Sequence, residues 1–408
     1  MDLTKALSSA ELGALALIRK PATLCLAVLM VLPINASATS EGAGSLDRTF
    51  SRDGKVLTVF QGQDAGAWAV AVQPDGKLVA AGEIVEAGEG GLHFAFALAR
   101  YNKDGTLDPT FGDGGKVTDL PEVAGGAYAT AIQADGKIVA GGDLALARYD
   151  PDGMLDPDFG GGDGVVPVDE VADIAIQGDG KIVVGGVGGL VRYNADGTHD
   201  PTFGGGDGVV VEVFVGDIAI QTDGKIVALR GEALVTRYNA DGSLDTSFGD
   251  DGSVSPAPFP GDYDWMNDLA IQADGTILAG GGTEACGGGP GGCDYWNTIF
   301  RFSSDGTALV SLSGSWSVMH EVLAIAIQED GKIIAVGPAE DGRIGMVRRR
   351  VGGALDQTFA RDGIRFSRFN RNSGFVAGVA LQANGRIVVA GRAEGAVHSK
   401  LALARYLA

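Results

Sequence analysis

The chain has 408 residues, a formal net charge of −21 at neutral pH and 66 glycines. An acidic chain without a basic stripe repels phosphate backbones, which argues against nucleic acid as a partner. The glycine content, and the absence of a long stretch with 3.6-residue periodicity after residue 40, exclude a helical solenoid.

The first 38 residues have the order of an export signal. Arg19 and Lys20 precede an apolar run over residues 24–34, and Ala36-Ser37-Ala38 follows. This order predicts a secretory signal peptide over residues 1–38 and a secreted, periplasmic or cell-surface location. A membrane anchor is the alternative, but the run is shorter than the roughly 18 to 20 residues that span a bilayer. We therefore expect no transmembrane segment after cleavage.

A short unit close to A-x-A-I-Q-x-D-G-K-I-V-x-x-G then returns seven times, at spacings of 44 to 60 residues. Such a period is typical of a repeat array. The Gln of each unit falls at Gln73, Gln133, Gln177, Gln221, Gln272, Gln328 and Gln382.

Each unit predicts four short antiparallel strands. Two alternating apolar runs flank an Asp-Gly pair such as Asp135-Gly136, which is a strong hairpin signal. A third run ends in Arg-Tyr, and an Asp-Gly turn, the segment L-D-P-T-F-G and a fourth run follow. Four strands in about 50 residues match one propeller blade, so we predict an all-β, seven-bladed β-propeller over residues 39–408.

The two ends of the repeat region complement each other. Residues 46–59 supply L-D-R-T-F and a fourth strand without the first three, whereas the chain stops after the third strand, at Arg405-Tyr406-Leu407-Ala408. We predict that the N-terminal strand closes the last blade, which leaves no open sheet edge. A monomer is the expected state.

These repeated residues resemble the delta-60 repeat family, a β-propeller of unknown function. The motifs that carry the resemblance are L-D-x-T-F-G, A-I-Q-x-D-G-K-I-V-V-A-G and A-L-A-R-Y-x-x-D-G-x-L-D, over about residues 46–408. The resemblance implies the fold and a surface or secreted setting, but no activity. The sequence departs from the pattern in the sixth blade, where Arg348-Arg349-Arg350 replaces Arg-Tyr and residues 309–312 stand at the place of L-D-x-T-F.

Two cysteines remain after the signal segment, Cys286 and Cys293, on either side of Gly-Gly-Gly-Pro-Gly-Gly. Export to an oxidising compartment predicts a disulfide between them. The alternative is a metal pair, which would need further Cys or His residues nearby, and the neighbouring sequence has none.

The longer and more variable connections all fall on one predicted face of the propeller, where strands two and three are joined and where blades are linked. Variable loops on a rigid scaffold commonly carry binding. Exposed rings in these loops would suit a glycan or protein ligand around blades five and six, although they could equally cap their own blades. The candidate ligand-binding residues are Tyr263, Trp265, Tyr295, Trp296, Trp316 and His320.

Three consecutive blades place an aspartate four residues before the recurring Gln: Asp173, Asp217 and Asp268. The innermost strands of a propeller converge on its channel, so three carboxylates there could hold calcium or a basic ligand group. Solvated acids at strand starts are the alternative. No other cofactor is expected.

Signals for catalysis are weak. The chain has no G-x-S-x-G, no H-E-x-x-H and no glycine-rich loop opening a helix. The leading hypothesis is therefore a secreted binding scaffold. The alternative is an enzyme at the channel mouth, a lyase or hydrolase that uses His320, Glu321 and the three aspartates.

Overall fold

The computed structural model describes residues 42–88, 91–118, 125–210, 214–231, 233–256, 262–286, 293–315 and 318–408. The predicted signal peptide lies outside these residues. Among the helices of the described residues, none is long and apolar enough to cross a membrane.

The described chain forms seven four-stranded antiparallel sheets, each of which is one blade. The strands of blades one to four are β2 (Asp64–Val72), β3 (Leu78–Gly88), β4 (Gly91–Tyr101), β5 (Lys116–Val117), β6 (Ala127–Ile132), β7 (Ile138–Gly142), β8 (Ala145–Tyr149), β9 (Val165–Pro167), β10 (Val171–Ile176), β11 (Ile182–Gly186), β12 (Gly189–Tyr193), β13 (Val209–Val210), β14 (Val215–Ile220), β15 (Ile226–Arg230), β16 (Leu234–Tyr238) and β17 (Ser253–Val254).

The remaining blades follow in the same order, with one short 3₁₀ turn, η2 (Glu340–Gly342), in blade six. Their strands are β18 (Asp262–Ile271), β19 (Ile277–Cys286), β20 (Cys293–Phe302), β21 (Leu312–Ser315), β22 (Ala324–Ile327), β23 (Ile333–Ala339), β24 (Arg343–Arg349), β25 (Ile364–Ser367), β26 (Gly374–Leu381), β27 (Ile387–Ala393), β28 (Lys400–Tyr406) and β1 (Lys55–Thr58).

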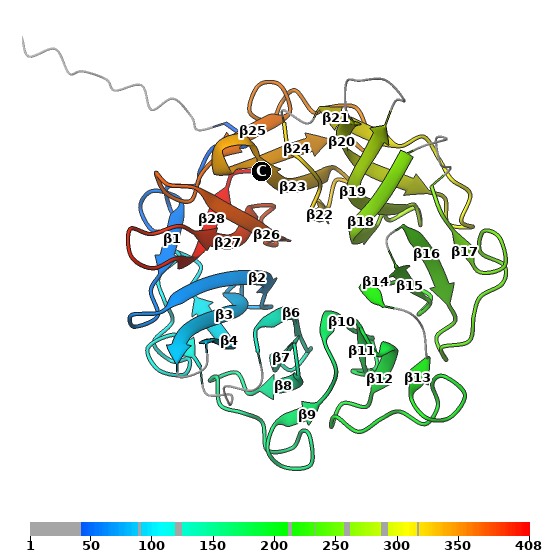
Figure 1. Ribbon diagram of the computed structural model, residues 1–408, viewed down its shortest axis with the longest axis horizontal. Coiled ribbons are helices and arrows are strands. Elements are labelled where there is room, and N and C mark those ends of the chain that lie inside the picture. Colours follow the sequence, from blue (N-terminus) through cyan, green and yellow to red (C-terminus); the bar gives the residue numbers. More distant parts are fainter. Residues whose placement is uncertain are drawn as a thin grey trace, which may run out of the picture. The chain divides into compact units, whose positions relative to one another are not determined.

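The blades stand around a central axis, with the first strand of each blade innermost (Figure 1). The predicted all-β, seven-bladed propeller is confirmed. In blade seven the outer strand is β1, which pairs antiparallel with β28 from Lys55 opposite Ala404 to Thr58 opposite Leu401. The edge of β28 is thereby covered by residues from the start of the described chain.

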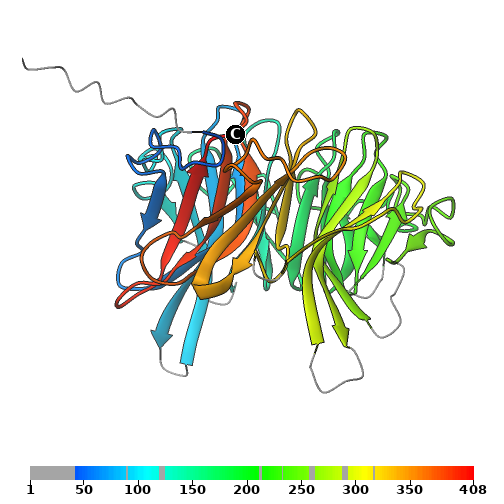
Figure 2. The same cartoon turned by 90° about the horizontal axis from the view of Figure 1, so that it is seen from above.

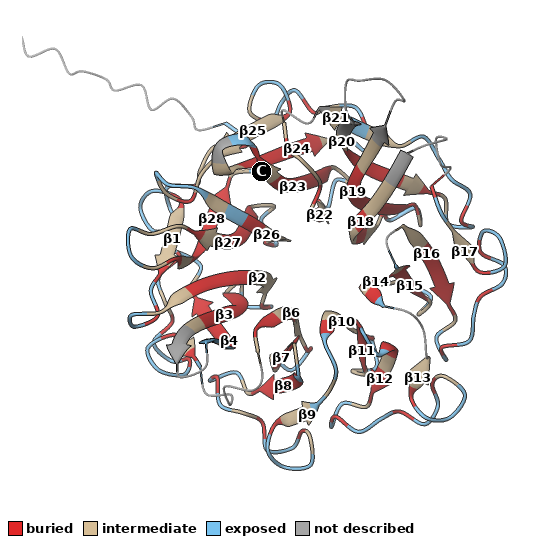
Figure 3. Ribbon diagram, in the orientation of Figure 1, coloured by how far each residue is buried: buried red, intermediate tan, exposed pale blue. Residues whose placement is uncertain are grey.

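The core of the propeller lies between neighbouring blades (Figure 3). Clusters of buried apolar side chains join each blade to the next, because both faces of a blade pack against a neighbour. The recurring Gln also hydrogen-bonds to the next blade. Gln73 Nε2 donates to the carbonyl of Gly136 in blade two, and Gln382 Nε2 of blade seven donates to the carbonyl of Gly76 in blade one, where the ring closes.

The third-strand Arg and the L-D-x-T-F turn form a repeated buried ion pair. In blade one, Arg100 Nε donates to Asp108 Oδ2 at 2.9 Å, the Arg100 guanidinium lies 4.7 Å from the centre of the Phe111 ring, and Lys77 Nζ lies 2.9 Å from the same Asp108 oxygen. The other pairs between Arg and Asp are Arg148–Asp156, Arg192–Asp200, Arg237–Asp245, Arg348–Asp356 and Arg405–Asp47. The Arg and Asp of the repeat motif thus form a buried ion pair in six of the seven blades.

The structure corrects the predicted place of the irregular turn. Residues 309–312 lead into β21, which begins at Leu312 and is the outer strand of blade five, and not into the outer strand of blade six. Blade six keeps the motif, since Arg348 Nε lies 2.9 Å from Asp356 Oδ2. The motif was hard to see in the sequence because Arg349 stands where most blades have Tyr. The bridge between Arg349 and Leu355 corresponds to the one between Tyr101 and Leu107 in blade one.

Blades one and five have the longest hairpins. Strands β3 and β4 have 11 residues each, and β18, β19 and β20 have 10 each, whereas β15 and β16 of blade four have 5. Figure 2 shows both long hairpins extending beyond their neighbours on the same face of the ring. This is the face of the connections between strands two and three, where the sequence places its variable loops.

Candidate functional site

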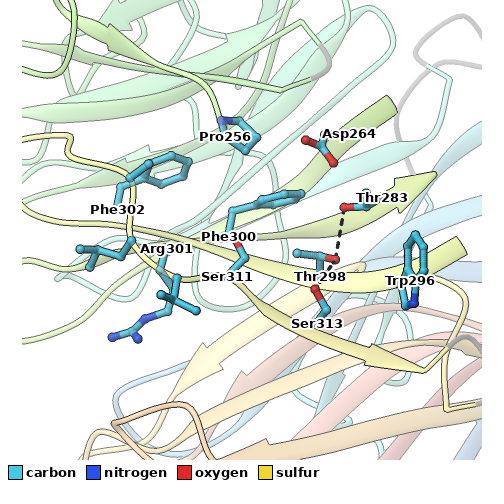
Figure 4. A pocket seen from close by; sticks show the side chains of 13 residues that line it. Pro256, Asp264, Thr283, Trp296, Thr298, Phe300, Arg301, Phe302, Ser311 and Ser313 are labelled. Atoms are coloured by element: carbon cyan, nitrogen blue, oxygen red, sulfur yellow. Dashed lines mark hydrogen bonds between the residues drawn. The ribbon is translucent and has the colours of Figure 1, made fainter. Parts of the chain in front are cut away.

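A cavity of about 710 Å³ lies along the face of blade five that is turned towards blade four (Figure 4). Trp296, Thr298, Phe300 and Phe302 line it from β20, because every second side chain of a strand points to the same face. Pro256, which follows the outer strand of blade four, lines the opposite side. The cavity is therefore built between two blades.

Three hydroxyl groups cross the cavity wall from strand to strand. Thr283 of β19, Thr298 of β20 and Ser313 of β21 follow one another across the sheet, with Oγ separations of 3.3 Å and 3.4 Å (Figure 4). Each hydroxyl can both donate and accept a hydrogen bond. Asp264 adds a carboxylate, because it lies opposite Thr283 in the register of β18 and β19.

Aromatic rings accompany this hydroxyl row. Trp296 lies opposite Thr283 in the register and is partly exposed, whereas Phe300 and Phe302 are buried and belong to the apolar cluster between blades four and five. The cavity thus runs from a half-open, hydroxyl-rich end at Trp296 to an apolar end at Phe302. A ligand with apolar ring faces and hydroxyl groups would find a partner for both.

Of the predicted ligand-binding residues, the structure brings Trp296 to this cavity and Trp265 to the other side of the blade. Trp265 pairs with Gly282 and Trp296 with the adjacent Thr283, so the two rings leave opposite faces of the hairpin. Trp265 Nε1 donates to Glu321 Oε2 at 2.8 Å, in the link to blade six. His320 lies in the same link, where its backbone N–H donates to the Pro338 carbonyl.

The remaining predicted residues fall at the limits of the described chain. Trp316 lies outside the described residues, as do the side chains of Tyr263, Tyr295, Cys286 and Cys293. The backbones of the two cysteines lie directly opposite each other in the register of β19 and β20. Opposed residues of antiparallel strands have Cα atoms about 4.5 to 5.5 Å apart, a span that a disulfide can bridge. The disulfide stays a prediction.

The three aspartates link neighbouring blades. Each carboxylate accepts a hydrogen bond from a backbone N–H of the next blade's innermost strand: Ile218 donates to Asp173, Leu269 to Asp217 and Ile325 to Asp268. In each case the aspartate comes directly after the β-bulge in the first strand of its own blade. The carboxylates therefore bind structural amides.

Burial raises the pKa of all three carboxyl groups. The pKa of Asp217 is well above its ordinary value, because its burial is reinforced by the charges of Asp173 and Asp268. Burial, with a contribution from Asp173, raises the pKa of Asp268 to about 8. Within the described chain no group of three or more His, Cys, Asp or Glu residues is arranged to hold a metal ion. The contacts of the three aspartates are those of links between blades, and the calcium site expected from the sequence is left to experiment.

Comparisons with known proteins agree with the architecture. Residues 73–111, 133–159, 177–203 and 221–248, in blades one to four, match the sequence profile of a β-propeller domain of unknown function, DUF5122. The chain is a β-propeller repeat protein. The more specific delta-60 name stays a prediction, and no curated protein matches the sequence.

One solved structure with a TM-score above 0.5 shows the same fold at low identity, and a second one is less similar. A catalytically inactive virginiamycin B lyase from Staphylococcus aureus, solved with quinupristin, is similar with a TM-score of 0.51 and 14% identity over 86% of this chain and 98% of that one. A protein of unknown function from Dyadobacter fermentans has a TM-score of 0.49 and 11% identity, over 86% and 97% of the two chains. At these identities the likeness extends to the fold alone.

Sequence reasoning missed most of the cavity wall. Thr298, Phe300 and Phe302 lie in a third strand, which the repeat pattern assigns to the core, and the hydroxyl row needs the register of three strands to become visible. One signal was present in the sequence. The third strands of blades one, two and seven end in A-L-A-R-Y, whereas that of blade five ends in T-I-F-R-F.

Proposed function

We propose that this chain is an exported β-propeller that binds a glycan in the cavity of blade five. The observation that carries the proposal is the hydroxyl row of Thr283, Thr298 and Ser313 beside the partly exposed ring of Trp296. Sugars present apolar C–H faces that stack on aromatic rings, and hydroxyl edges that exchange hydrogen bonds with side-chain hydroxyls.

The size and place of the cavity support the same proposal. A volume of about 710 Å³ falls within the range of small-ligand sites, which is roughly 300 to 1,000 Å³. Most of the wall comes from paired strands of blade five and so is held in place before a ligand arrives, which lowers the entropic cost of binding. Export is supported by the predicted signal peptide of residues 1–38 and brings the cavity into contact with extracellular or surface glycans.

The enzymatic alternative has less support. Glu321, one of its predicted groups, accepts hydrogen bonds from Trp265 and from Asn267 Nδ2 at 2.8 and 3.1 Å. The three aspartates are engaged with backbone amides. A scaffold without chemistry of its own is therefore the reading that these contacts favour.

A glycan array probed with the mature chain, residues 39–408, tests the proposal. We expect binding that W296A reduces at least tenfold and T298V reduces by less, because the ring supplies more contact area than one hydroxyl. The matched control is W68A, which removes a ring that packs edge-on against Tyr128 and Phe375, away from the cavity. A wild-type chain that binds no glycan, or equal binding by W296A, would contradict the proposal.

A further inference from the structure

The junction between blades six and seven has an arginine at a position where the other junctions have an aliphatic side chain. Each outer strand has one residue that pairs with the third-strand residue two places before the recurring Arg. In blade six this residue is Arg365, whereas in the other blades it is aliphatic and packs against the next blade. The aliphatic residues are Val117, Val166, Val210, Val254, Leu312 and Val56.

A second cation, Lys55 of β1, faces Arg365 from blade seven. Lys55 and Leu57 point to the same side of β1, and Leu57 belongs to the apolar cluster between blades six and seven. Arg365 and Ser367 likewise share one side of β25, and Ser367 Oγ is hydrogen-bonded to the hydroxyl of Tyr406 in blade seven. The two cationic side chains therefore point into the same junction from opposite blades.

These two cations lie together without a protein anion. Within the described residues neither side chain makes an ion pair, and Arg365 Nε is buried without a hydrogen-bond partner. Burial lowers the pKa of Lys55, and the charge of Arg365 adds to this lowering although Asp53 opposes it. At the junction of blades five and six the corresponding residues, Leu312 and Ile364, pack in one apolar cluster. Two partly buried like charges in place of such a pair destabilise the junction unless an anion joins them.

The guanidinium of Arg365 lies at a cavity of about 340 Å³ between the two blades. Leu46 lines this cavity and forms a β-bridge with Tyr406, the residue that is hydrogen-bonded to Ser367 on the same side of β25 as Arg365. Burial raises the pKa of Tyr406 to about 12, and the nearby charge of Arg365 partly opposes the rise. The strand register and the electrostatic contact thus place the guanidinium on the side of β25 where the cavity lies.

Two further arginines line the same cavity from the outer turn of blade seven. Arg48 stands at a position where the other six blades have an uncharged residue, and Arg52 follows four residues later. Both side chains are exposed to solvent. Among the described residues of the lining, Asp53 is the one carboxylate, so positive charges outnumber it. The cavity is therefore a local basic site on an acidic protein.

We propose that this cavity binds a phosphate group, which joins Arg365 and Lys55 across the junction and is held from outside by the two exposed arginines. A phosphate group carries close to two negative charges at neutral pH, and arginine donates paired hydrogen bonds to its oxygens. A carboxylate has one charge and would neutralise less of the cluster. Although the whole chain is acidic, charges more than about 8 Å apart are largely screened at physiological salt, so the local cluster decides. The site is separate from the cavity of blade five and does not rest on the function proposed above.

Thermal unfolding of the mature chain, residues 39–408, in inorganic phosphate tests the proposal. We expect millimolar phosphate to raise the melting temperature by a few degrees, because a ligand that binds only the folded state stabilises it by mass action. Sodium chloride at the same pH and ionic strength should not. An equal rise in both salts, or no rise in phosphate, would overturn the inference.

Three variants sharpen this test. R365V supplies the residue that most other blades have, so it should abolish the response to phosphate and maintain or raise the melting temperature without phosphate. R52G should weaken the response without destabilising the chain, because Arg52 has a φ of 71°, a left-handed conformation that favours glycine. R361G is the matched control, since Arg361 has the corresponding place in blade six and a φ of 80° but does not line the cavity. A response that survives in R365V, or that is lost in R361G, would overturn the inference.

Calorimetric titration with inorganic phosphate and with glycerol phosphate distinguishes two sources of the group. Tighter binding of the ester would support a phosphate carried by a larger ligand, and equal or weaker binding would support free phosphate. Binding of neither would overturn the inference. W296A should leave the phosphate response unchanged, and a glycan array without binding would overturn the proposed function but leave this inference standing.

Discussion

Blades one and five lengthen their hairpins on the same face of the ring, but the cavity with the hydroxyl row lies beside the long hairpin of blade five. Equivalent positions of the two blades differ in a consistent way. Blade one has small or apolar residues at these positions, and all of them are buried, whereas blade five has larger or polar residues. The pairs, with the blade-one residue first, are Ala65 and Asp264, Ile84 and Thr283, Ala95 and Trp296, Ala97 and Thr298, and Ala99 and Phe300.

The difference follows from the neighbouring blade. Blade one packs against blade seven, whose strands β26, β27 and β28 have 7 or 8 residues, and an apolar cluster fills the space between them. Blade five packs against blade four, whose first three strands have only 5 or 6 residues, so its extended part faces open space. A repeat protein can thus form a site by lengthening one blade beside a short one.

The largest effect is expected when the outer turn of blade five is copied into blade one. D108L would leave the buried Arg100 and the half-buried Lys77 around a missing anion, which costs about 3 to 5 kcal/mol of the free energy of unfolding. Denaturant unfolding measures this loss. L309D, the reverse change at the corresponding position of blade five, should not destabilise. A D108L chain as stable as the wild type would show that the ion pairs of Asp108 are not structural in blade one.

A smaller loss of stability is expected from substitutions that compare the face of blade one covered by blade seven with the face of blade five that lines the cavity. A95W places the ring of Trp296 at a buried position against blade seven, where overpacking costs about 1 to 3 kcal/mol. W296A removes a ring that is partly solvated and should cost less than A95W. Thermal or denaturant unfolding of both variants decides the matter. A greater loss in W296A would mean that Trp296 belongs to the core.

The raised pKa values of the three aspartates predict that the free energy of unfolding depends on pH. Because the pKa of Asp268 is raised from 3.8 to about 8, the folded chain binds more protons than the unfolded chain between these values. The free energy of unfolding should therefore fall as the pH rises from 4 to 8, and D268N should flatten this slope. Urea unfolding across the range measures it. An unchanged slope in D268N would contradict the assignment.

Calcium provides a further test of the same group. The aspartate oxygens that accept from Ile218, Leu269 and Ile325 are committed to backbone amides, so we expect millimolar calcium to leave the melting temperature unchanged. A ligand that binds only the folded state would raise it by mass action. A rise in the wild type that is lost when all three aspartates are changed to Asn would establish a calcium site there.

The smallest effect concerns the tip of the blade-five hairpin. The opposed backbones of Cys286 and Cys293 predict a disulfide that closes a short loop, far from the interblade core. Mass spectrometry of the exported chain should find the two cysteines linked. Reduction should leave the melting temperature within a few degrees of its original value. Two free thiols in the exported protein would contradict the prediction.

The repeat period, the Asp-Gly turns and the split last repeat were sufficient to predict a seven-bladed propeller, because each unit carries its own hairpin signals. The site was predicted less well. The sequence predicted Trp296 as a binding residue, but it also grouped it with Trp265. The two rings lie on opposite faces of the blade, which only the register of the strands reveals. Leu309 was assigned to the wrong blade, because Phe302 stands where the motif has Tyr and so hides the end of the third strand of blade five in the sequence.

Hydrogen exchange with and without the best glycan from the array tests the central claim most directly, because it compares the two long hairpins in one experiment. The account predicts slower exchange in β20 and β21 and in the connection between them, residues 296–315, with no change in β3 and β4 of blade one. Protection centred on blade one, or on the innermost strands around Asp173, Asp217 and Asp268, would contradict it.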